Sequence, residues 1–373
     1  MKKGLILLTL FCLVFTGCGK DKKNKSEITN ITTNEPAKIA VEKDTELNVT
    51  FLNVEQGDCT LLESNGEYML IDAGDDNTAY EVLQYMQNQN IESFKYVVGT
   101  HPDDDHIGGL DVIIDKFECD NIFMPNISAS SKSFTDLMQV IKAKDKRIVS
   151  PNVDDTYFLG DAVIKILGPV SEYDDDNNSS IVLMVYNQEN SFLFTGDIEK
   201  DAENDLLNSA IKADVIKIAH HGSSSSSTED FIKKVSPTYA VISCGINNDY
   251  GHPHAETLNT LRMNGIEVFR TDIQGTIIAK SDGHKITWNM SPDDSWISGE
   301  NFKNESLIQD GGAKHLPDDI TNAEYILNTK TKKFHLLTCE SVNDMNESNK
   351  KKVNKTRDEI INDGYEPCKN CNP

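Results

Sequence analysis

The feature that most restricts the fold of this chain is a group of four candidate metal ligands within six residues. His101, Asp103, Asp105 and His106 follow a short apolar run at residues 96–98. Imidazole and carboxylate are ligands that borderline divalent metals such as Zn²⁺ and Mn²⁺ accept. A turn that joins a strand to a helix lets side chains two and four positions apart converge on one point. We therefore expect a metal site at the end of a strand.

Apolar patterns along both halves of the chain predict a layered α/β fold. Short runs rich in β-branched and aromatic residues, bounded by turn residues, predict strands. These runs are residues 47–52, 59–62, 68–71, 96–98, 162–167, 180–186, 191–194, 215–219, 239–243 and 267–269. Helices are predicted at residues 78–89, 199–209, 228–235 and 255–264. Strands that carry helices in both halves indicate an α/β sandwich.

The ligand-bearing turn resembles the H-x-H-x-D-H signature of the metallo-β-lactamase superfamily. Within that superfamily, the chain is similar to the exported hydrolase domain of competence proteins of the ComEC type. Six further motifs resemble that domain and occur in the same order, at residues 51–58, 70–74, 177–180, 194–197, 220–223 and 250–254. The resemblance implies a four-layer αββα sandwich over residues 47–290 and a metal-dependent hydrolase.

The resemblance also implies the metal ligands. They are His101, Asp103, Asp105, His106, Asp197, His220 and His254. In this arrangement Asp197 bridges two ions, and Asp105 and Asp197 take part in catalysis. His221 and His252 remain alternatives to their neighbours, because the sequence does not say which ring faces inward.

Two departures from the superfamily pattern weaken the first of the two metal positions. Asp103 stands in place of the second histidine of the signature, and Asn178 stands where a further histidine is expected. An oxygen ligand is harder than nitrogen and shifts the preference towards Mn²⁺ or Mg²⁺. We therefore expect one or two divalent ions, Zn²⁺ or Mn²⁺.

A second group of ligands lies near the C-terminus. His335, Cys339, Cys368 and Cys371 form a Cys3His set with a C-x-x-C half. The segment resembles the Ada-type metal-binding module of bacterial hydrolases and nucleases. This implies a small α+β module with a structural zinc at residues 323–373, after a linker at 291–322. The alternative is a disulfide between two of the three cysteines.

The N-terminus has the layout of a bacterial export signal. Two lysines precede an apolar run that ends before Cys18, and this run is too short to span a bilayer as a mature segment. We expect a signal peptide at 1–17, lipidation of Cys18, a disordered tether at 18–46 and no transmembrane domain in the mature protein. The protein would then be anchored on the extracytoplasmic face of the membrane. An ordinary signal peptide, with Cys18 incidental, is the alternative.

The net charge limits the functions that this chain can perform. It is −24, from 60 acidic and 36 basic residues, so the surface as a whole repels polyanions.

The leading hypothesis is a phosphodiesterase or nuclease that acts on extracellular DNA. The alternatives are a phosphoesterase or small-ester hydrolase of the cell envelope, and a non-enzymatic surface binding protein. A basic run is formed by Lys350, Lys351, Lys352, Lys355 and Arg357. It is interpreted as a solvated helix, with a DNA-contacting face as the alternative.

Overall fold

The computed structural model describes residues 45–301, 324–336, 339–343, 345–355, 360–361 and 363–368. Several predicted features lie outside the described residues. These are the signal peptide, Cys18, residues 19–44 of the tether, residues 302–322 of the linker and Cys371.

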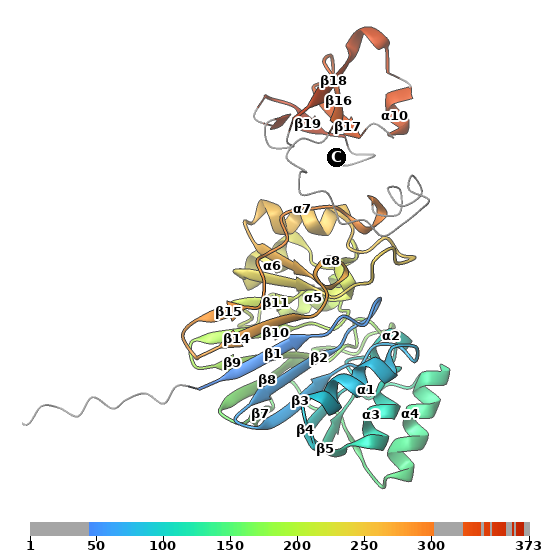
Figure 1. Cartoon of the computed structure of the whole chain (residues 1–373), viewed down its shortest axis with the longest axis vertical. Coiled ribbons are helices and arrows are strands. Elements are labelled where there is room, and N and C mark those ends of the chain that lie inside the picture. Colours follow the sequence, from blue (N-terminus) through green and yellow to red (C-terminus); the bar gives the residue numbers. More distant parts are fainter. Residues whose placement is uncertain are drawn as a thin grey trace, which may run out of the picture. The chain divides into compact units, whose positions relative to one another are not determined.

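Two mixed β-sheets lie against each other in residues 45–301 (Figure 1). The eight-stranded sheet has the order β15-β14-β1-β2-β3-β4-β5-β6. Its strands are β1 Leu47–Phe51, β2 Thr60–Ser64, β3 Glu67–Ile71, β4 Ser93–Val98, β5 Glu118–Phe123, β6 Ile148–Val149, β14 Ile277–Ser281 and β15 Ile286–Trp288. The seven-stranded sheet has the order β13-β12-β11-β10-β9-β8-β7. Its strands are β7 Thr156–Leu159, β8 Ala162–Gly168, β9 Val182–Asn187, β10 Asn190–Phe194, β11 Val215–Lys217, β12 Tyr239–Ile242 and β13 Glu267–Arg270.

Helices cover the outer face of each sheet, as Figure 1 shows. The first group is α1 Ala79–Asn88, α2 Asp104–Ile107, α3 Leu110–Lys116 and α4 Lys132–Ala143. The second group is α5 Lys200–Leu206, the 3-10 turn η1 Ala219–Gly222, α6 Glu229–Val235, α7 Ala255–Met263 and α8 Thr271–Gln274.

The sequence pattern explains the layers. Successive side chains of a strand point to opposite faces of the sheet. In β9, Leu183 and Val185 join the core between the sheets. Val182 and Met184 join the core beneath the second group of helices. The predicted αββα sandwich is confirmed.

The described part of the predicted linker packs against the sandwich. The Asp293 amide donates to the Val268 carbonyl at 2.7 Å, and the Gly299 amide donates to the Pro253 carbonyl at 2.9 Å. The buried guanidinium of Arg270 donates to the Ile297 carbonyl. The sandwich therefore extends beyond the predicted boundary at residue 290, because these backbone groups are satisfied by the domain.

The C-terminal segment forms a four-stranded sheet with the order β18-β16-β17-β19. Its elements are β16 Glu324–Asn328, β17 Lys333–Leu336, α10 Glu340–Asn343, η2 Glu347–Asn349, β18 Lys350–Asn354 and β19 Glu366–Pro367. The first three lysines of the basic run, residues 350–352, therefore lie in strand β18, and the helix predicted there is wrong. Val353 packs against the small core that contains Tyr325 and Leu327, and this contact favours the strand.

Candidate metal centre

The candidate ligands of the sandwich all follow the ends of strands. The turn after β4 carries His101 and Asp103, and it leads into α2, which carries Asp105 and His106. Asp197 follows β10, and the two histidines of η1 follow β11. His252 and His254 lie between β12 and α7. Segments far apart in the sequence therefore meet at one site, because each leaves its sheet beside the others.

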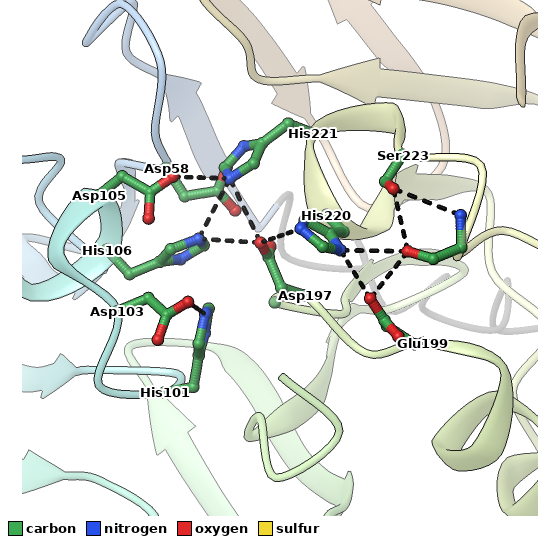
Figure 2. Close-up of polar contacts among 12 residues, drawn as sticks. Asp58, His101, Asp103, Asp105, His106, Asp197, Glu199, His220, His221 and Ser223 are labelled. Carbon is green, nitrogen blue, oxygen red and sulfur yellow. Dashed lines mark hydrogen bonds and ion pairs between the residues drawn. The ribbon is translucent and has the colours of Figure 1, made fainter. Parts of the chain in front are cut away.

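Four coordinating atoms converge at the centre of this site (Figure 2). Nε2 of His221 lies 3.2 Å from Oδ2 of Asp105 and 3.3 Å from Oδ2 of Asp197. Nε2 of His106 lies 3.3 Å from both Oδ2 of Asp197 and Nε2 of His221. In a tetrahedral site with zinc–ligand bonds of about 2.0 Å, neighbouring ligand atoms are about 3.3 Å apart. The four separations given above match that spacing for the pairs of atoms that they join.

Hydrogen bonds fix the orientation of both central imidazoles. Nδ1 of His106 lies 2.8 Å from Oδ2 of Asp72, and Nδ1 of His221 lies 2.9 Å from the Ser243 carbonyl oxygen. Both partners are acceptors, so each Nδ1 carries the proton in the neutral ring, and each Nε2 presents a lone pair. Two lone pairs at 3.3 Å repel each other unless a cation lies between them. The donor set fits a divalent metal ion.

The electrostatics of the site also favour a cation. Burial lowers the pKa of His106 and of His221, but the nearby carboxylates, Asp197 first, outweigh burial and raise both pKa values well above the usual range. Burial raises the pKa of Asp197, but the two imidazoles outweigh it, and the pKa of this carboxyl falls well below its usual value. The carboxylates therefore favour positive charge at this position, and a metal ion would supply that charge while both imidazoles stay neutral.

A second position has fewer donors close together. His101, His106 and Asp197 offer atoms within 4.8 Å of one another. Nε2 of His101 lies 3.7 Å from Oδ2 of Asp103. Among the described residues, Nε2 of His101 and Oδ1 of Asp197 are buried without a hydrogen-bond partner. Asn178 adds nothing here, since its Oδ1 accepts from the backbone at the start of α5.

The downstream histidines require a correction to the ligands preferred from the sequence. His221, not His220, occupies the centre, whereas Nε2 of His220 lies 3.9 Å from Asp197 and its Nδ1 contacts Glu199 at 3.2 Å. Both ring nitrogens of His254 contact backbone groups, the Ser224 amide at 2.9 Å and the Tyr250 carbonyl at 3.1 Å. The ring of His254 is thus engaged elsewhere.

His252 lies closer to the centre than its sequence neighbour. Its ring stacks beside that of His221, with centroids 6.1 Å apart. Its Nδ1 is one of the buried nitrogens of the described region that have no hydrogen-bond partner. Burial first, and then the neighbouring histidines, lower the pKa of His252 to about 3. The ring is therefore neutral near pH 7, as a ligand or hydrogen-bond acceptor must be.

Two supporting interactions were not predicted from the sequence. Asp72 orients His106 and accepts from the Thr100 hydroxyl at 2.7 Å. Lys217 on β11 is buried and forms an ion pair with Asp58. Asp72 and Asp58 both lie in segments that match family motifs, and these matches could have identified them from the sequence. Nothing in the apolar run around Lys217 marked it as part of the site.

The C-terminal segment holds its own group of candidate ligands. His335, Cys339 and Cys368 offer atoms within 4.8 Å of one another, and Sγ of Cys339 lies 3.6 Å from Nδ1 of His335. Cys339 is a free thiol. The three residues fit three positions of a tetrahedral zinc site.

A model of the metallo-beta-lactamase superfamily matches residues 52–246, which is more than half of the chain. The chain belongs to this superfamily. By class it is a metal-dependent hydrolase, and its metallo-β-lactamase domain contains the centre formed by Asp105, His106, Asp197 and His221.

Curated relatives of the metallo-β-lactamase domain include competence proteins. The chain is 31% identical to ComE operon protein 3 of Bacillus subtilis, over 57% of this chain and 28% of that protein. It is 29% identical to Recombination protein 2 of Haemophilus influenzae, over 61% of this chain and 28% of that protein. The match thus spans just over a quarter of each relative. Among solved structures, the metallo-beta-lactamase fold protein YhfI of Bacillus subtilis is 12% identical, with a TM-score of 0.43 over 64% of this chain and all of that one.

Proposed function

We propose that this protein is a metal-dependent phosphodiesterase that cleaves DNA at the cell surface. The observation that carries the proposal is a set of four separations of 3.2 to 3.3 Å, which join donor atoms of His106 and His221 to each other and to Asp105 and Asp197. The similarity to competence and recombination proteins supports DNA as the substrate.

The four residues have different roles in this proposal. A divalent ion held by these four residues would activate a water molecule at neutral pH and stabilise charge on a phosphoryl oxygen. Asp72 and the Ser243 carbonyl hold the two imidazoles in place. The Asp105 side chain is 31% exposed, whereas those of His106, Asp197 and His221 are 0%, 4% and 2% exposed. Asp105 is therefore the ligand that is exposed to solvent and can orient the attacking water.

Export, lipidation of Cys18 and a structural zinc at His335, Cys339, Cys368 and Cys371 complete the proposal. Within the described residues, no helix has both the length and the apolar character that a membrane span requires. The zinc would stabilise the C-terminal sheet, since structural zinc sites contribute directly to folding. It supplies no catalytic step, because four protein ligands leave no open position.

A substrate screen tests the proposed activity. The full chain is treated with a chelator, divided, and given Mn²⁺, Mg²⁺, Zn²⁺ or no metal. We expect cleavage of single-stranded DNA and of bis(p-nitrophenyl) phosphate in at least one metal, and none without metal.

Other substrates in the same screen separate the alternatives. They are plasmid DNA, p-nitrophenyl acetate and a chromogenic β-lactam. Turnover of only the acetate or the lactam identifies a small-ester or lactam hydrolase instead. If no metal gives hydrolysis of any phosphodiester, the proposal is wrong.

A further inference from the structure

An exposed aromatic side chain lies beside the metal centre. Tyr250 is 66% exposed, on the segment between β12 and α7. Ile246 on the same segment is 50% exposed. This segment also supplies His252, whose ring lies next to the central imidazole of His221. The exposed ring of Tyr250 thus belongs to the surroundings of the proposed active site.

Three rings form a nearly parallel series that leads from solvent to the metal centre. Tyr250 stacks on His252 with ring centroids 5.5 Å apart and planes inclined by 17°. His252 stacks in turn on His221 at 6.1 Å and 26°. One face of the tyrosine ring is therefore covered by an imidazole. The exposed fraction of 66% places its other face in solvent.

Hydrogen bonds hold this segment in one conformation. Nδ2 of Asn248 donates to the carbonyls of Gly245 and His252 at 2.8 and 2.6 Å. Its Oδ1 accepts from the amides of Tyr250 and His252 at 3.2 and 3.0 Å. Gly245 packs so closely on Gln56 that an added Cβ would lie 2.6 Å from the backbone nitrogen of Gln56. The tyrosine ring is therefore positioned before any substrate binds.

The charge of the protein makes such a ring useful. A chain with a net charge of −24 gains little from general attraction to phosphates. Stacking of a base on an aromatic ring provides affinity that depends on neither charge nor sequence. A pre-positioned ring also loses little conformational freedom on binding.

We infer that Tyr250 is a stacking platform for a nucleobase of the substrate, one or two nucleotides from the cleaved phosphate. The inference rests on the proposed phosphodiesterase function. A base in duplex DNA has both faces covered by its neighbours, so the platform selects single-stranded or unstacked DNA. Tyr250 is thus a specificity-determining residue, and the metal ligands perform the chemistry.

The test compares a single-stranded oligonucleotide with an abasic strand of the same length and charge. In wild type we expect kcat/KM to be about tenfold higher for the strand with bases, as one stacked base provides. Tyr250→Ala should bring this ratio to within about twofold of one, whereas Tyr250→Phe should keep it. The matched control is Tyr80→Ala on α1, where the tyrosine is 70% exposed and has no stacking partner among the described residues. It should keep the wild-type ratio.

A binding measurement separates this inference from the proposed activity. Strands with methylphosphonate linkages carry no backbone charge and resist cleavage, and their binding is followed by fluorescence anisotropy. We expect wild type to bind the strand with bases more tightly than the abasic one, and Tyr250→Ala to lose this difference. If Tyr250→Ala keeps the wild-type preference in both assays, the platform does not exist. If wild type cleaves no phosphodiester but shows the Tyr250-dependent binding difference, only the proposed activity fails.

Discussion

Asp197→Asn is expected to lower kcat/KM for bis(p-nitrophenyl) phosphate by about a thousandfold or more. The carboxylate lies 3.3 Å from both central imidazoles, and Asn keeps its shape while removing its charge. Charge stabilisation by a catalytic metal is worth several kcal/mol, and each 1.4 kcal/mol is about tenfold in rate. The metal content of the purified variant should fall together with its activity.

The matched control for this variant is Asp201→Asn. Asp201 is an exposed carboxylate in the first turn of α5. It lies four residues from Asp197 in the sequence and makes no contact with the central imidazoles. The control should retain wild-type rate and metal content. An Asp197→Asn variant that hydrolyses the substrate at the rate of the control would contradict the assigned role.

Lys217→Met is expected to lower the free energy of unfolding by about 3–5 kcal/mol, the usual effect of removing one partner of a buried ion pair. Lys217 is only 2% exposed, and the variant leaves Asp58 buried without its lysine partner. Burial lowers the pKa of Lys217, but Asp58 and Asp197 outweigh it and raise this pKa. Burial raises the pKa of Asp58, but Lys217 and His221 outweigh it and lower that pKa. Both shifts indicate that the charged forms attract each other.

Urea denaturation in the presence of a chelator measures this effect without a contribution from metal binding. Both tryptophans of the chain, Trp288 and Trp296, lie outside the C-terminal sheet, so their fluorescence reports unfolding of the sandwich.

The control is Lys233→Met, which removes an exposed ion pair with Glu229 at 2.5 Å and should change the free energy of unfolding by less than about 1 kcal/mol. The double variant Asp58→Asn/Lys217→Met should recover much of the loss. Equal stability of Lys217→Met and the control would show that the buried pair is unimportant.

The sequence predicted the residue types of the site better than their orientation. His220 and His221 are adjacent and chemically identical, and both have positive φ, at 51° and 53°. Which ring faces the metal centre depends on this backbone geometry, and no residue type encodes it. The role of Lys217 was missed for a related reason, since its partner Asp58 lies far away in the sequence and comes close only after the two sheets pack.

Elements with a clear apolar pattern were predicted, and polar or short ones were not. Helix α1 and strands β9 and β10 agree with prediction to within two residues at each end. Helix α4 was missed although Leu137 and Ile141 are buried at helical spacing, because the first part of this helix, residues 132–136, is mostly polar. The edge strands β6 and β15 are only two and three residues long, and no local pattern identifies them. Their pairing depends on neighbouring strands.

The position of the bound ion tests the central claim most directly. Crystals of the full chain containing Mn²⁺ or Zn²⁺ would be measured at the absorption edge of the metal. We expect an anomalous peak within about 2.0–2.2 Å of Asp105, His106, Asp197 and His221. A peak coordinated by His220 or His254 instead of His221, or no peak among these four residues, would contradict the account.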